Sequence, residues 1–187
     1  MKSFTELPEG YAEILHIDLQ KDKKLMTIVN VLAVVISVAM ILIAAFFVPL
    51  GRYFAFNMTQ LLVLCVGFVA YMVLHELVHG ITMRCFSEAK VKYGFTGMYA
   101  FAGSDAYYCR KHYVIIALAP IVVWGIVLGI LNFLVPMNWF YVVYLIQVGN
   151  ISGAAGDLYV SWRFCKLPED ILVRDTGVAM TVFSRKS

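Results

Sequence analysis

Charged residues are scarce in this sequence. Only 14% of its 187 residues are Asp, Glu, Lys or Arg, whereas 61% are hydrophobic and the mean hydropathy is +0.80. Soluble domains carry about 25% charged residues, so this balance excludes an ordinary water-soluble domain and indicates a small polytopic membrane protein. The sequence also lacks internal repeats, low-complexity linkers and room for a separate soluble domain. We therefore expect a single membrane domain over residues 1–187.

Two further absences narrow the class of protein. The four cysteines show no C-x-x-C spacing, so we expect free thiols rather than a disulfide framework. The fifteen Lys and Arg residues are dispersed rather than clustered, which argues against a nucleic-acid-binding patch.

Four stretches are long and apolar enough to cross a bilayer. They lie near residues 25–50, 59–81, 113–135 and 139–161. The first has a longer apolar run than a signal peptide, so we interpret it as a retained anchor. We therefore expect an all-α integral membrane protein with four transmembrane helices and a short cytosolic β-hairpin between the second and the third.

Basic residues are distributed unevenly between the predicted loops. Of the fifteen Lys and Arg residues, only Arg52 lies between the first two spans, and none lies between the last two. An excess of Lys and Arg marks the cytosolic side of a membrane protein. We therefore expect a multi-pass protein of the cell membrane, with both termini and the loop Arg84–His112 in the cytosol.

That loop contains the pattern of the expected hairpin. Residues 91–95 alternate apolar with polar or small side chains, Thr96-Gly97 marks a turn, and residues 98–101 follow as a second strand. An irregular interfacial loop is the alternative. Residues 178–183 are compatible with one more short strand, and residues 11–17 with a strand or an interfacial helix.

The most informative motif is His75-Glu76-Leu77-Val78-His79, which lies inside an apolar run. Residues four apart lie on one face of a helix, so both imidazoles can bind one metal ion. Glu76 lies close enough to activate a metal-bound water. Because ionisable groups are costly in a bilayer, they indicate a functional site. We predict that His75 and His79 bind Zn²⁺ and that Glu76 is the catalytic base.

Asp157 is the predicted third metal ligand, since a catalytic zinc usually takes three protein ligands. Glu76 and Asp157 are the only acidic residues within the predicted spans. At about 1.5 Å per residue, both histidines and Asp157 lie ~24–30 Å from the outer edge, near the cytosolic face. An aspartate that merely faces cytosolic water at a helix end is the alternative.

Small residues precede Asp157, including Gly149 and Gly153. They allow close helix packing or an unwound segment beside a water-filled cavity. Asn150 lies on nearly the same helical face as Asp157. We predict that it binds substrate or supports a metal ligand, with plain helix packing as the alternative.

These residues resemble the site-2 protease class of intramembrane zinc metalloproteases. That class carries H-E-x-x-H on one core helix and a metal-binding aspartate two helices later. More closely, the chain resembles the small putative zincin peptidases, a family of four-span membrane proteins, and the segments 117–120 and 167–170 fit that family. The chain departs from site-2 proteases because it has no proline between Asn150 and Asp157, Leu158 follows the aspartate, and a PDZ-like domain is missing.

The resemblance implies an intramembrane zinc metalloprotease that hydrolyses peptide bonds of transmembrane or membrane-associated substrates, with the bilayer as its other partner and no nucleic acid. The predicted hairpin would hold the substrate by strand addition. A non-proteolytic zinc-binding receptor or scaffold is one alternative, although a structural zinc site needs no base such as Glu76. A metal transporter is another, but the first and third predicted helices contain few polar residues.

Overall fold

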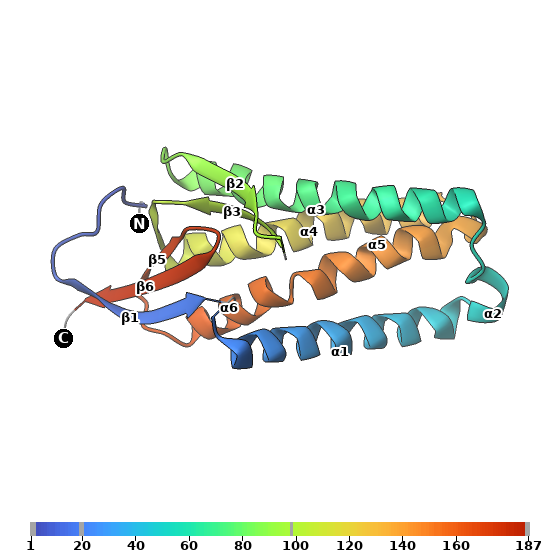
Figure 1. Ribbon diagram of the computed structural model, residues 1–187, viewed down its shortest axis with the longest axis horizontal. Coiled ribbons are helices and arrows are strands. Elements are labelled where there is room, and N and C mark those ends of the chain that lie inside the picture. The colour runs from blue at the N-terminus through green and yellow to red at the C-terminus, as the bar shows by residue number, and fades with distance from the viewer. Residues whose placement is uncertain (1–2, 19–20, 98, 186–187) are drawn as a thin grey trace. The chain divides into compact units, whose positions relative to one another are not determined.

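The computed structural model describes residues 3–18, 21–97 and 99–185. Its elements are labelled in Figure 1. In chain order they are β1 (Tyr11–Asp18), α1 (Lys23–Phe47), α2 (Leu50–Tyr53), α3 (Met58–Phe86), β2 (Val91–Phe95), β3 (Ala100–Ser104), β4 (Tyr107–Cys109), α4 (Arg110–Leu134), the 3₁₀ turn η1 (Met137–Trp139), α5 (Phe140–Gly153), α6 (Ala155–Cys165), β5 (Leu172–Asp175) and β6 (Ala179–Arg185).

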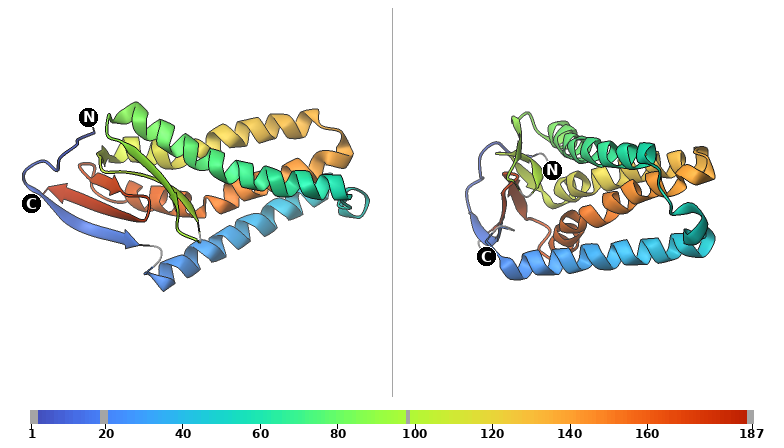
Figure 2. Two further views of the ribbon diagram at one scale, coloured as in Figure 1. Left: turned by 45° about the horizontal axis from the view of Figure 1, so that its top comes forward. Right: turned by 45° about the vertical axis from the view of Figure 1, so that its right-hand side comes forward.

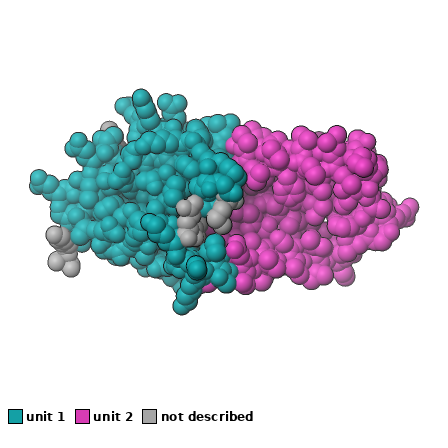
Figure 3. All heavy atoms as spheres, in the orientation of Figure 1, with its two compact units in different colours: residues 1–27, 76–119, 157–187 teal, residues 28–75, 120–156 magenta. Residues whose placement is uncertain are grey.

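The chain forms two compact units, which are coloured separately in Figure 3. The first comprises residues 1–27, 76–119 and 157–187, and it contains all of the strands. The second comprises residues 28–75 and 120–156 and is helical. The boundary falls inside the continuous helix α3, between His75 and Glu76.

Three of the described helices are long and apolar enough to cross a membrane, namely α1, α3 and α4. They expose large apolar side chains, as Phe46 and Phe133 show with 84% and 94% of their surface accessible. Such exposure is unfavourable in water and natural in lipid. The protein is therefore suited to association with a membrane.

The expectation of four transmembrane helices is wrong, because the stretch 139–161 is not one helix. A 3₁₀ turn begins it, α5 ends at Gly153, and α6 begins at Ala155. Ala154 lies between them with φ −87° and ψ 20°. The 14 residues of α5 rise only about 21 Å, less than the hydrocarbon core of a bilayer. Glycines at 153 and 156 favour the break because glycine has low helix propensity.

The expectation of an all-α fold is also wrong. Four strands form an antiparallel sheet in the order β1-β6-β5-β4. Strands β1 and β6 lie side by side (Figure 2). Tyr11 pairs with Arg185, and Asp18 pairs with Ala179. The sequence pattern of β1 is compatible with a strand or a helix, and that of β6 only weakly indicates a strand. The pairing of these two segments, which are far apart in the sequence, decides their conformation.

The predicted hairpin between α3 and α4 is confirmed. Strands β2 and β3 pair antiparallel, from Val91 opposite Ser104 to Phe95 opposite Ala100. Met98, which was predicted to begin the second strand, lies outside the described residues.

The hairpin is attached to the rest of its unit by an ion-pair network and a close backbone approach. Asp105 Oδ2 lies 2.7 Å from Lys92 Nζ on β2, and Asp105 Oδ1 lies 2.7 Å from Arg174 Nη2 on β5. A side chain at Gly103 would overlap the backbone of Thr176. These contacts hold β3 beside the β5–β6 turn.

Candidate metal centre

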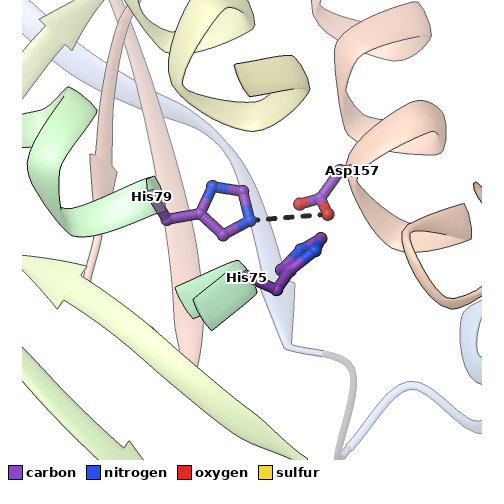
Figure 4. Close-up of side chains that lie close together, drawn as sticks. All are labelled: His75, His79 and Asp157. Atoms are coloured by element: carbon purple, nitrogen blue, oxygen red, sulfur yellow. Dashed lines mark ion pairs between the residues drawn. The ribbon is translucent and has the colours of Figure 1, made fainter. Parts of the chain in front are cut away.

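Helix α3 and the first turn of α6 bring the predicted ligands together. His75, His79 and Asp157 each offer one ligand atom, and these atoms lie within 4.8 Å of one another (Figure 4). His79 Nε2 lies 3.6 Å from Asp157 Oδ2. Both histidines are buried, as expected for groups that bind a metal rather than solvent.

The helix break explains how Asp157 reaches this position. Because α6 begins at Ala155, Asp157 stands in the first turn of a new helix. The positive end of the helix dipole and the unpaired N–H groups of that turn favour a carboxylate there. A continuous helix over residues 139–161 would offer no such environment.

The orientation of His79 is fixed by α4. His79 Nδ1 lies 2.9 Å from the carbonyl oxygen of Ile116. A carbonyl can only accept, so Nδ1 carries the proton of this bond, and Nε2 is the ring nitrogen that faces Asp157. Pro120 makes this possible, since its missing N–H leaves the Ile116 carbonyl without its usual helical donor.

His75 is hydrogen-bonded in a comparable way, but to a side chain. Its Nδ1 lies 2.7 Å from Tyr71 Oη, and Tyr71 Oη lies 3.0 Å from Asn150 Oδ1. Asn150 is completely buried and also donates from Nδ2 to the Ile121 carbonyl, at 3.2 Å. Sequence reasoning did not single out Tyr71, although its position four residues before His75 places it on the same helical face.

Glu76 points toward the hairpin. Its half-buried carboxylate lies close to the backbone of Ala102 on β3. The backbone N–H of Thr96 donates to the carbonyl of Tyr99. From this pair onward, non-hydrogen-bonded and hydrogen-bonded residue pairs alternate along β2 and β3. This alternation turns the N–H and C=O groups of Ala100 and Ala102 away from β2, toward the outer edge of β3.

Asp175 is a buried acidic residue that no sequence motif marks. It accepts hydrogen bonds from Tyr113 Oη at 2.5 Å and from the backbone N–H of Gly177 at 2.8 Å. Burial raises the pKa of its carboxyl above the usual range, while the hydrogen bond from Tyr113 opposes this shift. Asp175 ends β5, and only the fold places it near the charges of His79 and Asp157.

Two other histidines lie elsewhere. His112 stacks on Phe86 with ring centroids 4.1 Å apart, and His16 Nδ1 lies 3.2 Å from Thr181 Oγ1. Neither belongs to the group of candidate metal ligands.

The donor set fits zinc. Two imidazole nitrogens and one carboxylate oxygen are ligands that Zn²⁺ accepts readily, and three protein ligands leave one coordination position for catalysis. The adjacent Glu76 supplies a carboxylate that is not needed as a ligand.

A search of curated proteins and of solved structures found no match. The model of the family described as "putative zincin peptidase" matches residues 68–172, more than half of the chain. The matched segment contains the H-E-x-x-H motif and Asp157. The protein therefore belongs to the putative zincin peptidase family, whose name indicates a zinc-dependent peptidase.

Proposed function

We propose that the protein is an intramembrane zinc metalloprotease that cleaves peptide bonds of membrane or membrane-near substrates. The observation that carries this proposal is the convergence of His75, His79 and Asp157 ligand atoms within 4.8 Å. The position of the motif inside α3, a helix able to cross a bilayer, supports chemistry at membrane depth.

His75, His79 and Asp157 would hold the zinc ion. When bound, zinc polarises the scissile carbonyl and makes water more acidic. Glu76 takes the proton from the attacking water and then delivers it to the leaving amine.

The outer edge of β3 is the proposed site of substrate binding. In the described part of the chain, no further strand pairs with this edge. Ala100 and Ala102 direct backbone groups toward it, and Ala102 contacts Glu76. An extended peptide that adds to β3 would therefore lie beside the catalytic base.

We further propose that the sheet faces the cytosol. Strands β1, β4 and β6 belong to one sheet, so both ends of the described chain and the α3–α4 connection lie on one side of the membrane. This is the side with almost all of the Lys and Arg residues, which is the cytosolic side in membrane proteins.

The decisive experiment compares Glu76→Gln with ligand variants. Glu76→Gln keeps the shape and the ligands, so the purified protein should retain zinc while cleavage is lost. His79→Ala and Asp157→Ala should each lower the zinc content. Quantitative proteomics of membrane fragments, in cells with the wild type or Glu76→Gln, identifies the cleavage products.

Two outcomes would overturn the proposal. Identical fragment patterns for wild type and Glu76→Gln would indicate a zinc-binding receptor or scaffold. Zinc flux into proteoliposomes that persists in Glu76→Gln would indicate a transporter.

A further inference from the structure

We propose that Tyr71 and Asn150 are positioning residues that fix the tautomer and orientation of His75. Neither offers a ligand atom to the metal; Asn150 acts through Tyr71, and Tyr71 acts through its contact with His75. This inference rests on the metal-binding role proposed for His75.

The first step is the orientation of the Asn150 amide. Its Nδ2 lies 3.2 Å from the carbonyl oxygen of Ile121, which can only accept a hydrogen bond. The nitrogen must therefore face Ile121, because the opposite orientation would set two acceptors against each other. Oδ1 consequently faces Tyr71.

The second step is the position of the Tyr71 proton. Asn150 Oδ1 can only accept, and it lies 3.0 Å from Tyr71 Oη. The Asn150 backbone carbonyl, 3.5 Å from the same hydroxyl, is also an acceptor. The single Tyr71 proton is therefore donated to Asn150, which leaves the hydroxyl oxygen free to accept.

The third step fixes His75. Its Nδ1 lies 2.7 Å from the Tyr71 hydroxyl, whose proton is already directed to Asn150. Nδ1 must therefore be the donor, so it is protonated and Nε2 carries the lone pair that a metal requires. The direction of every bond in this chain follows from the one carbonyl of Ile121.

Burial makes the arrangement costly to break. Tyr71 and His75 are each 8% exposed and Asn150 is fully buried, so water does not readily replace a lost partner. Tyr71, His75, Ile121 and Asn150 all belong to the second compact unit. The contacts that set the tautomer therefore lie within one unit.

The test measures the zinc affinity of the purified full-length protein by competition with a chelator. Tyr71→Phe removes only the hydroxyl, and we expect about 10- to 100-fold weaker zinc binding. Asn150→Leu should weaken binding as well, because the Tyr71 hydroxyl loses its nearer acceptor at 3.0 Å and keeps only the backbone carbonyl at 3.5 Å, so its proton can turn toward His75. The double variant should bind zinc no more weakly than Tyr71→Phe, since Asn150 acts only through the hydroxyl.

Tyr144→Phe is the matched control. Tyr144 belongs to the same unit, and its hydroxyl donates to the Met40 carbonyl, 2.9 Å away, rather than to His75. We expect wild-type zinc affinity from this variant. If Asn150→Leu does not fold, Asn150→Ala takes its place, and Tyr71→Phe beside Tyr144→Phe remains decisive.

Three outcomes overturn the proposal. Unchanged zinc affinity in Tyr71→Phe would show that the hydroxyl does not position His75. Additive losses in the double variant would show that the two residues act separately, through packing. A wild-type protein that binds no zinc would overturn the proposed function as well as this inference. The first two outcomes overturn only the positioning role of Tyr71 and Asn150.

Discussion

His79 donates its Nδ1 proton to the carbonyl oxygen of Ile116, 2.9 Å away. In a regular helix this carbonyl would accept from the backbone N–H four residues later, but that residue is Pro120. The proline thus leaves a carbonyl of α4 available to orient a candidate metal ligand on α3. Pro120 therefore weakens α4 but helps to orient His79 on α3.

Replacing Pro120 with alanine should weaken zinc binding. Pro120→Ala restores a backbone N–H that competes with His79 for the Ile116 carbonyl. We expect zinc affinity to fall by up to about 10-fold. Groups that accept a hydrogen bond from the other ring nitrogen of a metal-binding histidine contribute on this scale. The apo protein should become more stable to heat, because alanine favours the helix and proline opposes it. Chelator competition and thermal unfolding measure the two effects.

Gly129→Ala provides the control for this substitution. Gly129 lies in the same helix, and a Cβ there meets nothing within 4 Å. This variant should stabilise α4 by roughly 1 kcal/mol without changing zinc affinity. Equal zinc affinity in Pro120→Ala and wild type would refute the role of the proline.

The local sequence was sufficient to predict the two candidate ligands that lie on one helix. The spacing of His75 and His79 defines a shared helical face wherever the helix lies. Asp157 was found by a weaker argument, because it is one of two acidic residues in the predicted spans. The structure places it with both histidines.

The contributions of distant segments were not predictable from local patterns. Asp175 lies on a strand whose place depends on pairing with β4 and β6. Tyr71 is one aromatic residue among many in an apolar helix, and only the position of Asn150 reveals its polar role. The break at Ala154 was foreseen only as a general consequence of nearby glycines.

Proline substitutions on the two edges of the hairpin test how substrate binds. Ala100→Pro removes an N–H from the outer edge of β3, whereas Phe95→Pro removes one from the outer edge of β2. If substrate adds to β3, cleavage should fall at least 10-fold in Ala100→Pro only, a loss that corresponds to about 1.4 kcal/mol. Zinc content should be unchanged in both. A loss of cleavage confined to Phe95→Pro would place the substrate on β2 instead.

The ion pairs of Asp105 predict a dependence of stability on acid pH. Lys92 and Arg174 lower the pKa of Asp105 from 3.8 to about 2. A carboxyl with a lowered folded-state pKa stabilises the fold above its unfolded pKa and loses this contribution as pH falls through the folded value. The thermal midpoint of wild type should therefore exceed that of Asp105→Asn above about pH 4, with the difference vanishing near pH 2.

The size of this difference should be modest. The Asp105 side chain is 52% exposed, so water and salt screen both ion pairs. High salt should reduce the difference at neutral pH. A difference that persists undiminished at pH 2 would assign the effect to packing or backbone conformation rather than to charge.

Cysteine labelling tests the orientation in the membrane. The four native cysteines are first replaced by alanine, because Cys65, Cys85 and Cys165 are exposed. Single cysteines are then introduced at Met137 on η1, which is 51% exposed, and at Val178 between β5 and β6, which is 37% exposed. Retention of zinc by the cysteine-free parent shows that its site is intact.

A membrane-impermeant maleimide on intact cells should modify Met137→Cys and spare Val178→Cys until the membrane is permeabilised. This result is expected because we propose that the sheet containing β5 and β6 faces the cytosol, the side that is rich in Lys and Arg. Labelling of Val178→Cys in intact cells, with Met137→Cys protected, would reverse the orientation. Substrate addition to β3 would then take place outside the cell, and the proposed cytosolic site would have to be abandoned.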